Sequence, residues 1–190
     1  MSRVIYLQHS SINLDFAERG GRSLAVYGAP QIPACGGPEF AFQYPRSMDA
    51  WSDTIPKDID VLVTHTPPQC HLDLPQHMGC EWLLKECWRR KPLLHVFGHV
   101  HLGYGQEQVH WDEAQRMYEQ ICQRRNFGLL WDTIDIFAWV NAARLVMHSI
   151  LGILWNRIWG GNDKQTLMVN AALMLGSTGR LGHEPQVVSI

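Results

Sequence analysis

Short apolar runs separated by turn residues make up the first part of the chain. Residues 4–7, 12–14 and 24–27 have the composition of β-strands, and Gly20 followed by Gly21 predicts a turn before the third of them. From residue 28 to about 56 proline and glycine recur, which predicts a long loop. A loop of this length inside a compact domain usually has a functional role.

The middle of the chain predicts a strand, a helix and a second strand. Residues 59–64 and 93–97 are short, mostly apolar runs, as expected of strands covered on both faces. Between them, residues 79–90 carry apolar side chains at helical spacing, and Lys91 and Pro92 end the helix. This order forms a βαβ unit, so we expect the two strands to be parallel. The helical face consists of Cys80, Leu83, Leu84, Cys87 and Trp88.

The remainder predicts two helical stretches and two closing strands. Asp112 is placed to cap the first helix, and the second runs from about 129 to 159. Polar residues interrupt the second stretch, which argues against a membrane-spanning helix. Residues 166–170 and 186–189 predict strands. We expect an apolar stripe of the long helix to cover an otherwise open face of the sheet: Ile136, Val140, Ala143, Met147, Leu151 and Leu154.

The composition indicates one globular domain over residues 1–190. Apolar residues make up 46% of the chain, which is enough for a core, and 16 basic against 18 acidic residues argue against a nucleic-acid binder. The five cysteines are odd in number and form no C-x-x-C pair. This pattern favours a reducing compartment, and we expect a cytoplasmic protein.

Histidines follow both central strands. His65 comes directly after the first, and His99 and His101 follow the second within Gly98-His99-Val100-His101. The carboxyl ends of parallel strands are where α/β sheets place ligands, and imidazole binds Mn, Fe and Zn. In an extended segment His99 and His101 would point the same way. The sequence therefore predicts that these three histidines bind metal in one cleft.

The other histidines are interpreted as structural. His95 lies inside a strand and is expected to be a hydrogen-bonded core residue. A zinc site built from the neighbouring Cys/His cluster is disfavoured, because Cys80 belongs to the apolar face of a helix. That cluster consists of Cys70, His71, His77 and Cys80; His9, His71, His77, His110, His148 and His183 are expected at the surface or in packing.

These motifs resemble the calcineurin-like metallophosphoesterases, over roughly residues 4–110 and 166–190, with a helical insertion at about 111–160. The resemblance implies an α/β fold of the four-layer α/β/β/α sandwich type and hydrolysis of a small phosphoester by two divalent metal ions (Mn, Fe or Zn). It also implies that His65 and His99 bind one metal and His101 the other. The resemblance rests on Tyr6–Gln8, Val26–Pro30, Val61–Pro68 with Leu72-Asp73, His95–His101, Gly103–Gly105 and Val169–Ala171.

The family's D-x-H, G-D and G-N-H-[DE] motifs do not occur in this sequence. The resemblance is therefore to the C-terminal half of the domain, no catalytic residue is assigned, and we expect little activity from this chain alone. A partial sandwich would also leave an apolar face uncovered, so we expect poor solubility or oligomers. The alternatives are a catalytically inactive fragment and an interaction module.

The interaction module would use residues 129–159. Four tryptophans lie there, which fits a helical hairpin packed on the domain or on a partner, or a helix at a membrane surface with peripheral association. Only Arg144 and Arg157 supply cations, fewer than interfacial helices usually carry. The tryptophans are Trp131, Trp139, Trp155 and Trp159.

Overall fold

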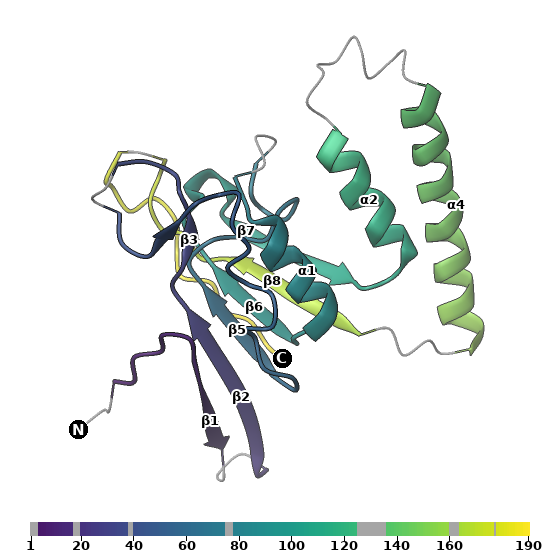
Figure 1. Cartoon of the computed structure of the whole chain (residues 1–190). Coiled ribbons are helices and arrows are strands. Elements are labelled where there is room, and N and C mark those ends of the chain that lie inside the picture. Colours follow the sequence, from purple (N-terminus) through teal and green to yellow (C-terminus); the bar gives the residue numbers. More distant parts are fainter. Residues whose placement is uncertain are drawn as a thin grey trace.

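The computed structural model describes residues 4–16, 20–37, 40–74, 78–124, 136–159, 164–176 and 178–190. Within these residues the chain is α/β, built on one six-stranded mixed sheet with strand order β1-β2-β5-β6-β8-β7 (Figure 1). A separate pair of two-residue strands, β3 and β4, lies in the loop after β2. The strands are β1 Ser10–Phe16, β2 Arg22–Ala29, β3 Ile32–Pro33, β4 Gln43–Tyr44, β5 Val61–Thr64, β6 Leu94–Phe97, β7 Gly105–His110 and β8 Gln165–Asn170.

The central strands run parallel and the edge strands antiparallel. β2, β5, β6 and β8 are parallel neighbours, whereas β1 pairs antiparallel with β2 and β7 antiparallel with β8. The predicted βαβ unit is confirmed, with β5 and β6 joined through α1 (Glu81–Arg90). Lys91 ends this helix in the left-handed conformation, and its backbone N–H donates to the carbonyl of Cys87.

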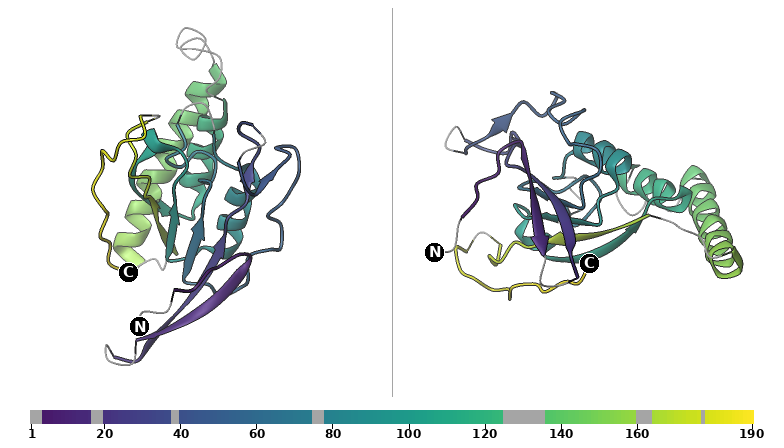
Figure 2. Two further views of the ribbon diagram at one scale, coloured as in Figure 1. Left: turned by 90° about the vertical axis from the view of Figure 1, so that its left-hand side faces the viewer. Right: turned by 90° about the horizontal axis from the view of Figure 1, so that it is seen from below.

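Helix α1 and the loop after β2 cover one face of the sheet, where the main core lies (Figure 2). Alternate residues of β5, β6 and β8 point into it. His95 is fully buried there, and its Nε2 lies 2.9 Å from the Thr64 hydroxyl, as expected of a core histidine. Burial lowers the pKa of His95 to about 3, so the ring is neutral. The core contains Tyr27, Trp51, Ile55, Leu62, Leu83, Cys87, Phe97, Val109 and Met168.

The opposite face carries a much smaller cluster. Val26, Val61, Leu94 and Val169 are buried on it, with Val188 from the C-terminal segment packed against them. Val63, also in a central strand, remains 39% exposed. This face is therefore thinly covered, and no second large sheet packs on it within the described residues.

Two predicted strands are wrong. Residues 4–7 are apolar and residues 186–189 contain Val187 and Val188, but neither segment pairs with a strand of the sheet, and Val4 and Val187 are almost fully exposed. Conversely, β7 forms from the polar segment Gly105–His110, because β8 provides a complete antiparallel partner for its backbone.

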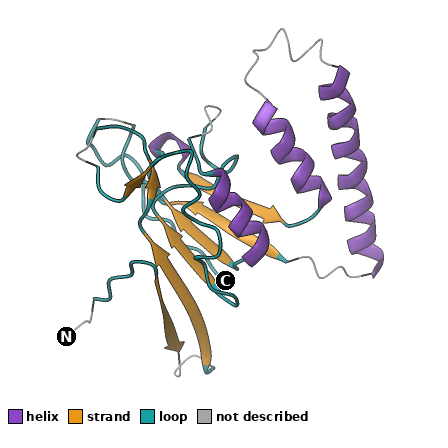
Figure 3. Cartoon of the chain, viewed as in Figure 1, coloured by secondary structure: helices purple, strands orange, loops and turns teal. Residues whose placement is uncertain are grey.

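Helices α2 (Glu113–Arg124) and α4 (Ile136–Trp159) stand side by side beyond the β7 edge (Figures 1 and 3). Asp112 caps α2 as predicted: its Oδ1 accepts from the backbone N–H of Gln115 at 2.8 Å. The prediction for α4 is wrong, because its apolar stripe covers no sheet face and is exposed from Ile136 to Leu154. Residues 129–135, including Trp131, lie outside the described residues. By length and composition α4 is able to cross a membrane.

Candidate histidine site at the ends of β5 and β6

The parallel pairing of β5 and β6 brings His65 and His99 together. His65 directly follows β5, and His99 follows β6 after Gly98, whose backbone N–H donates to the carbonyl of His65 at 3.1 Å. The two imidazole rings lie 5.0 Å apart, centroid to centroid, at an interplanar angle of 57°. The ends of these two neighbouring strands thus bring two imidazole rings together at one edge of the sheet.

The segment after β6 is not extended. The expectation that His99 and His101 follow one another in an extended chain is therefore wrong. His99 has φ of +64°, and the N–H of Val100 donates to the carbonyl of Gly98 at 2.7 Å. This is a tight three-residue turn with His99 at its centre, a strained conformation for a residue with a side chain. His101 then begins a short 3₁₀ helix, His101–Gly103.

His101 is held by the C-terminal segment. Its Nδ1 lies 2.5 Å from the carbonyl oxygen of Gly176. Because a carbonyl only accepts, Nδ1 carries the hydrogen, and in the neutral ring the lone pair lies on Nε2. A backbone carbonyl that fixes one imidazole nitrogen in this way is a common support for a metal-binding histidine.

The surroundings of His65 and His99 favour the neutral form of both imidazoles. Burial, with a further contribution from His101, lowers the pKa of His65. Burial also lowers the pKa of His99 to about 4, with His65, His101 and Arg46 adding to the effect. Arg46, from the long loop after β2, contributes the positive charge. Its nitrogens also approach the carbonyls of Met78 and Gly79 at 3.4 and 3.5 Å.

Sequence reasoning missed Arg46 as part of this neighbourhood. The only signal was its position in the long loop of residues 28–56, which was expected to be functional. Its proximity to His99 depends on how that loop folds over the sheet edge, and no local pattern encodes this.

A side-chain amide ties the two loops of the site together. Asn170, fully buried at the end of β8, donates from Nδ2 to the carbonyls of Val100 at 2.9 Å and Leu72 at 3.2 Å. Gly103 lies against the same carbonyl of Leu72: a Cβ placed on it would be 1.9 Å from that oxygen. The positions of the loops after β5 and β6 are therefore coupled through β8.

The residues present do not fit a two-metal centre. Among the described side chains, no group of three or more His, Cys, Asp or Glu residues is arranged to hold a metal ion. The histidine cluster supplies imidazole nitrogens without a carboxylate to bridge or neutralise two cations. In the disfavoured zinc cluster, Cys80 instead contacts the Tyr44 hydroxyl at 3.2 Å, and His77 lies outside the described residues.

His71 forms a second polar site that the sequence did not reveal. It is fully buried, with Nδ1 3.2 Å from Glu107 of β7 and Nε2 3.2 Å from Glu119 of α2. Trp88 of α1 donates to the other oxygen of Glu119 at 2.8 Å. Burial alone would lower the pKa of His71, but the two carboxylates outweigh it and raise the pKa to about 9. His71 is thus a buried imidazolium that joins three elements.

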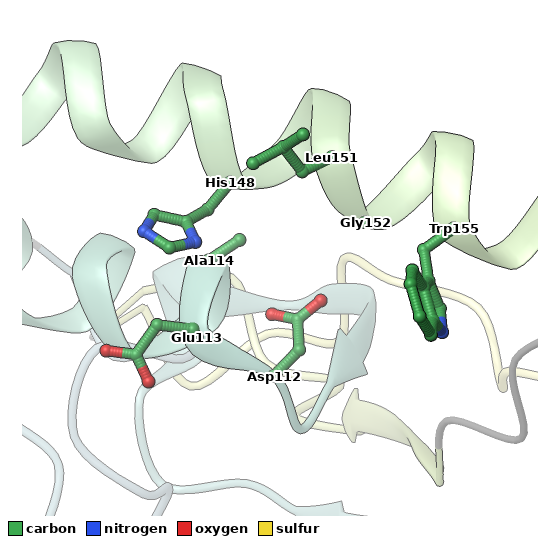
Figure 4. A pocket seen from close by; sticks show the side chains of 7 residues that line it. All are labelled: Asp112, Glu113, Ala114, His148, Leu151, Gly152 and Trp155. Carbon is green, nitrogen blue, oxygen red and sulfur yellow. The ribbon is translucent and has the colours of Figure 1, made fainter.

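A shallow groove lies apart from both histidine sites, between α2 and α4 (Figure 4). Its volume is about 270 Å³. His148 and Trp155 of α4 point toward the first turn of α2, where Asp112 and Glu113 lie. The groove shows that the contact between the two helices is loose at this end.

No protein-family model matches the chain. The chain is 41% identical, over 91% of its length, to the probable rhamnogalacturonate lyase C of Emericella nidulans, but it spans 15% of that protein. It is 39% identical, over 55% of its length, to human metallophosphoesterase domain-containing protein 1 and to a UPF0046 protein of Caenorhabditis elegans, spanning 32% and 26% of them. The chain thus covers at most about a third of each of these relatives. Over about half of its own length, it is related to the metallophosphoesterase domain-containing proteins.

Proposed function

We propose that this chain forms part of a metal-dependent phosphoester hydrolase of the metallophosphoesterase type, in which His65, His99 and His101 are metal ligands. One observation carries the proposal: neutral imidazoles from two parallel strand ends lie together at the sheet edge, with ring centroids of His65 and His99 5.0 Å apart. Neutral imidazole is the form that binds Mn, Fe or Zn.

The proposal extends to the fold. The thinly covered face around Val61 and Val169 is where the second sheet of a four-layer α/β/β/α sandwich would pack. In the complete enzyme that second sheet, and the carboxylates that the histidine cluster lacks, would come from residues outside this chain.

Arg46 supports a phosphoester as the substrate. Its guanidinium contributes to the lowered pKa of His99 and would provide a permanent positive charge for a phosphate anion. The proposed ligands and this one cation account for only part of the proposed site, so no hydrolytic step follows from this chain alone. Activity is proposed for the complete protein only.

The lyase name of the fungal relative gives no competing proposal. That name belongs to a protein of which this chain spans 15%. The described site offers no feature that favours elimination over phosphoester chemistry.

The first test measures metal binding by the isolated chain. Calorimetric titration with Zn²⁺ or Mn²⁺ should show weak binding that is abolished by His65→Ala or His99→Ala. The matched control His110→Ala removes an imidazole from the end of β7, away from the cluster, and should leave binding unchanged. Equal binding by all variants would refute the role of these histidines.

The second test measures hydrolysis. With a chromogenic phosphodiester and Mn²⁺, the isolated chain should turn over no faster than His99→Ala. A chimera in which the chain replaces the matched part of the human relative should hydrolyse the ester, and should lose this activity with His99→Ala. An inactive but folded, metal-loaded chimera would favour the alternative of an inactive fragment.

A further inference from the structure

A helix on the surface of a soluble domain usually turns its apolar face toward the protein and its polar face toward water. Helix α4 does the reverse. The side chains that face α2 and are partly covered are mostly small or polar. Most of the large apolar side chains point away from the protein, except Leu151 and Trp155, which line the groove beside α2. The partly covered residues are Ala138, Asn141, Ala142, Leu145, His148, Ser149 and Gly152. The exposed ones include Ile136, Phe137, Trp139, Val140, Met147, Ile150, Ile153, Leu154 and Ile158.

The exposed apolar surface is continuous along the whole helix. Val140, Met147 and Leu154 recur every seven residues and lie on one line, each about half exposed. Residues Ile136–Trp155 are long and apolar enough to enter a membrane, and none of that window is buried. Isolated exposed apolar residues are common, but a continuous surface of this length marks a binding site.

The sheet topology excludes α4 as a spanning helix. β8 follows α4 in the chain, yet it hydrogen-bonds to β6 and β7, which both precede α4. A single crossing would place β8 on the opposite side of the bilayer from its two partners. The segments that join α4 to the body, 125–135 and 160–164, are too short for a second crossing, which needs about 20 residues.

A second copy of the chain is a poor occupant for this surface. A 24-residue helix is about 36 Å long and about 10–12 Å wide, so a pair of such faces would bury on the order of 800 Å² in total. Stable interfaces usually bury about 1,200–2,000 Å². A bilayer surface covers the same face with no such requirement.

The charges of α4 also complement a lipid surface. The helix contains Arg144 and Arg157, both exposed, and no acidic residue. Trp139 is exposed among the outward apolar residues, whereas Trp155 is exposed at the groove beside α2. Arginine and tryptophan are the side chains that favour the headgroup region.

We propose that α4 lies in the plane of a membrane surface, with the face of Val140, Met147 and Leu154 inserted among the lipids and α2 turned toward water. The inference is independent of the proposed hydrolase function. It assigns the helical insertion the role of a peripheral, non-spanning membrane anchor.

The test uses the full chain and large vesicles of phosphatidylcholine, with or without phosphatidylserine. The chain should sediment with both kinds of vesicle, and more completely with phosphatidylserine. The triple variant Val140→Gln, Met147→Gln, Leu154→Gln should bind the vesicles at least about tenfold more weakly than the wild type. These positions are exposed, and glutamine is a good helix former, so the fold should be retained, as checked by circular dichroism.

A matched control removes the same number of exposed apolar side chains elsewhere. Val4→Gln, Leu181→Gln, Val187→Gln should bind vesicles like the wild type. Tryptophan fluorescence should be quenched most by lipids brominated near the headgroup. Quenching that is strongest at the bilayer centre would refute the in-plane position. Absence of vesicle binding, or a dimer that the α4 variant dissociates, would refute the lipid surface as the occupant.

Discussion

His71 places a positive charge in the protein interior, between β7, α2 and the loop after β5. Both of its nitrogens lie within hydrogen-bonding distance of carboxylates, and its exposure is zero. A buried charge is tolerated only with partners of this kind, and removal of one partner leaves the others uncompensated. The packing of α2 on the body of the protein therefore depends on the protonation state of one side chain.

This site predicts a pH-dependent stability. The pKa of His71 is raised to about 9 from 6.5, so its contribution is fully present below pH 6.5 and is lost as the pH rises through about 9. The expected size is on the order of 3 kcal/mol. Urea unfolding between pH 6 and 9.5 should show this decline in the free energy of unfolding.

Variants separate this effect from other titrations. His71→Gln should be less stable than the wild type at pH 6 and should show a much flatter pH profile. His110→Gln should keep the slope of the wild type. A slope that persists in His71→Gln would contradict the assignment.

Gly103 predicts a steric effect at the histidine site. Gly103→Ala would place its methyl group 1.9 Å from the carbonyl oxygen of Leu72, so the two loops must separate. We expect a loss of about 1–3 kcal/mol in the free energy of unfolding. Gly98→Ala is the control, because its methyl group would meet no atom within 4 Å. Equal stability of the two variants in thermal melts would refute this prediction.

Among the elements, those with an apolar pattern and a neighbour in the sheet were predictable. β5, α1 and β6 form almost where the pattern placed them, because their side chains fill the main core. β7 was missed because it lies at an edge, where several of its side chains stay polar and exposed. Residues 4–7 show the opposite case: an apolar run without a partner strand remains irregular.

Helix α4 changes an expectation about solubility. If its stripe covered the sheet, deletion of residues 129–159 would worsen aggregation. Because the stripe is exposed, we now expect that replacing 129–159 by a short Gly/Ser linker reduces aggregation in size-exclusion chromatography. The near-ultraviolet spectrum of the core tryptophans should be retained. Increased aggregation with loss of that spectrum would indicate that α4 protects the body.

The strands of the sheet should differ in how readily they unfold locally. β6 and β8 pair on both sides and lie under the main core, whereas most of the β1 strand, at the opposite edge, is exposed. Hydrogen exchange followed by mass spectrometry should show the slowest exchange in β6 and β8 and the fastest strand exchange in β1. Uniform protection across the sheet would contradict this order.

The candidate site was predictable only as far as topology determines it. Parallel strands bring His65 and His99 together wherever a βαβ unit forms, so their proximity follows from the pattern of apolar runs. The left-handed turn at His99 and the approach of Arg46 depend on loop conformations. Such conformations arise from tertiary contacts, such as the amide of Asn170, and have no local periodicity.

The late position of β8 in the chain has a consequence for folding during synthesis. β8 fills the space between β6 and β7, but it emerges from the ribosome after both of them and after the whole of α4. Until then, β6 and β7 have no partner on their facing edges, and the apolar α4 is already exposed. Unpaired strand edges and apolar helices are what chaperones bind and what aggregates form from. Release of residue 170 is therefore the step that completes the sheet, and slow translation after α4 should lower the yield of folded protein.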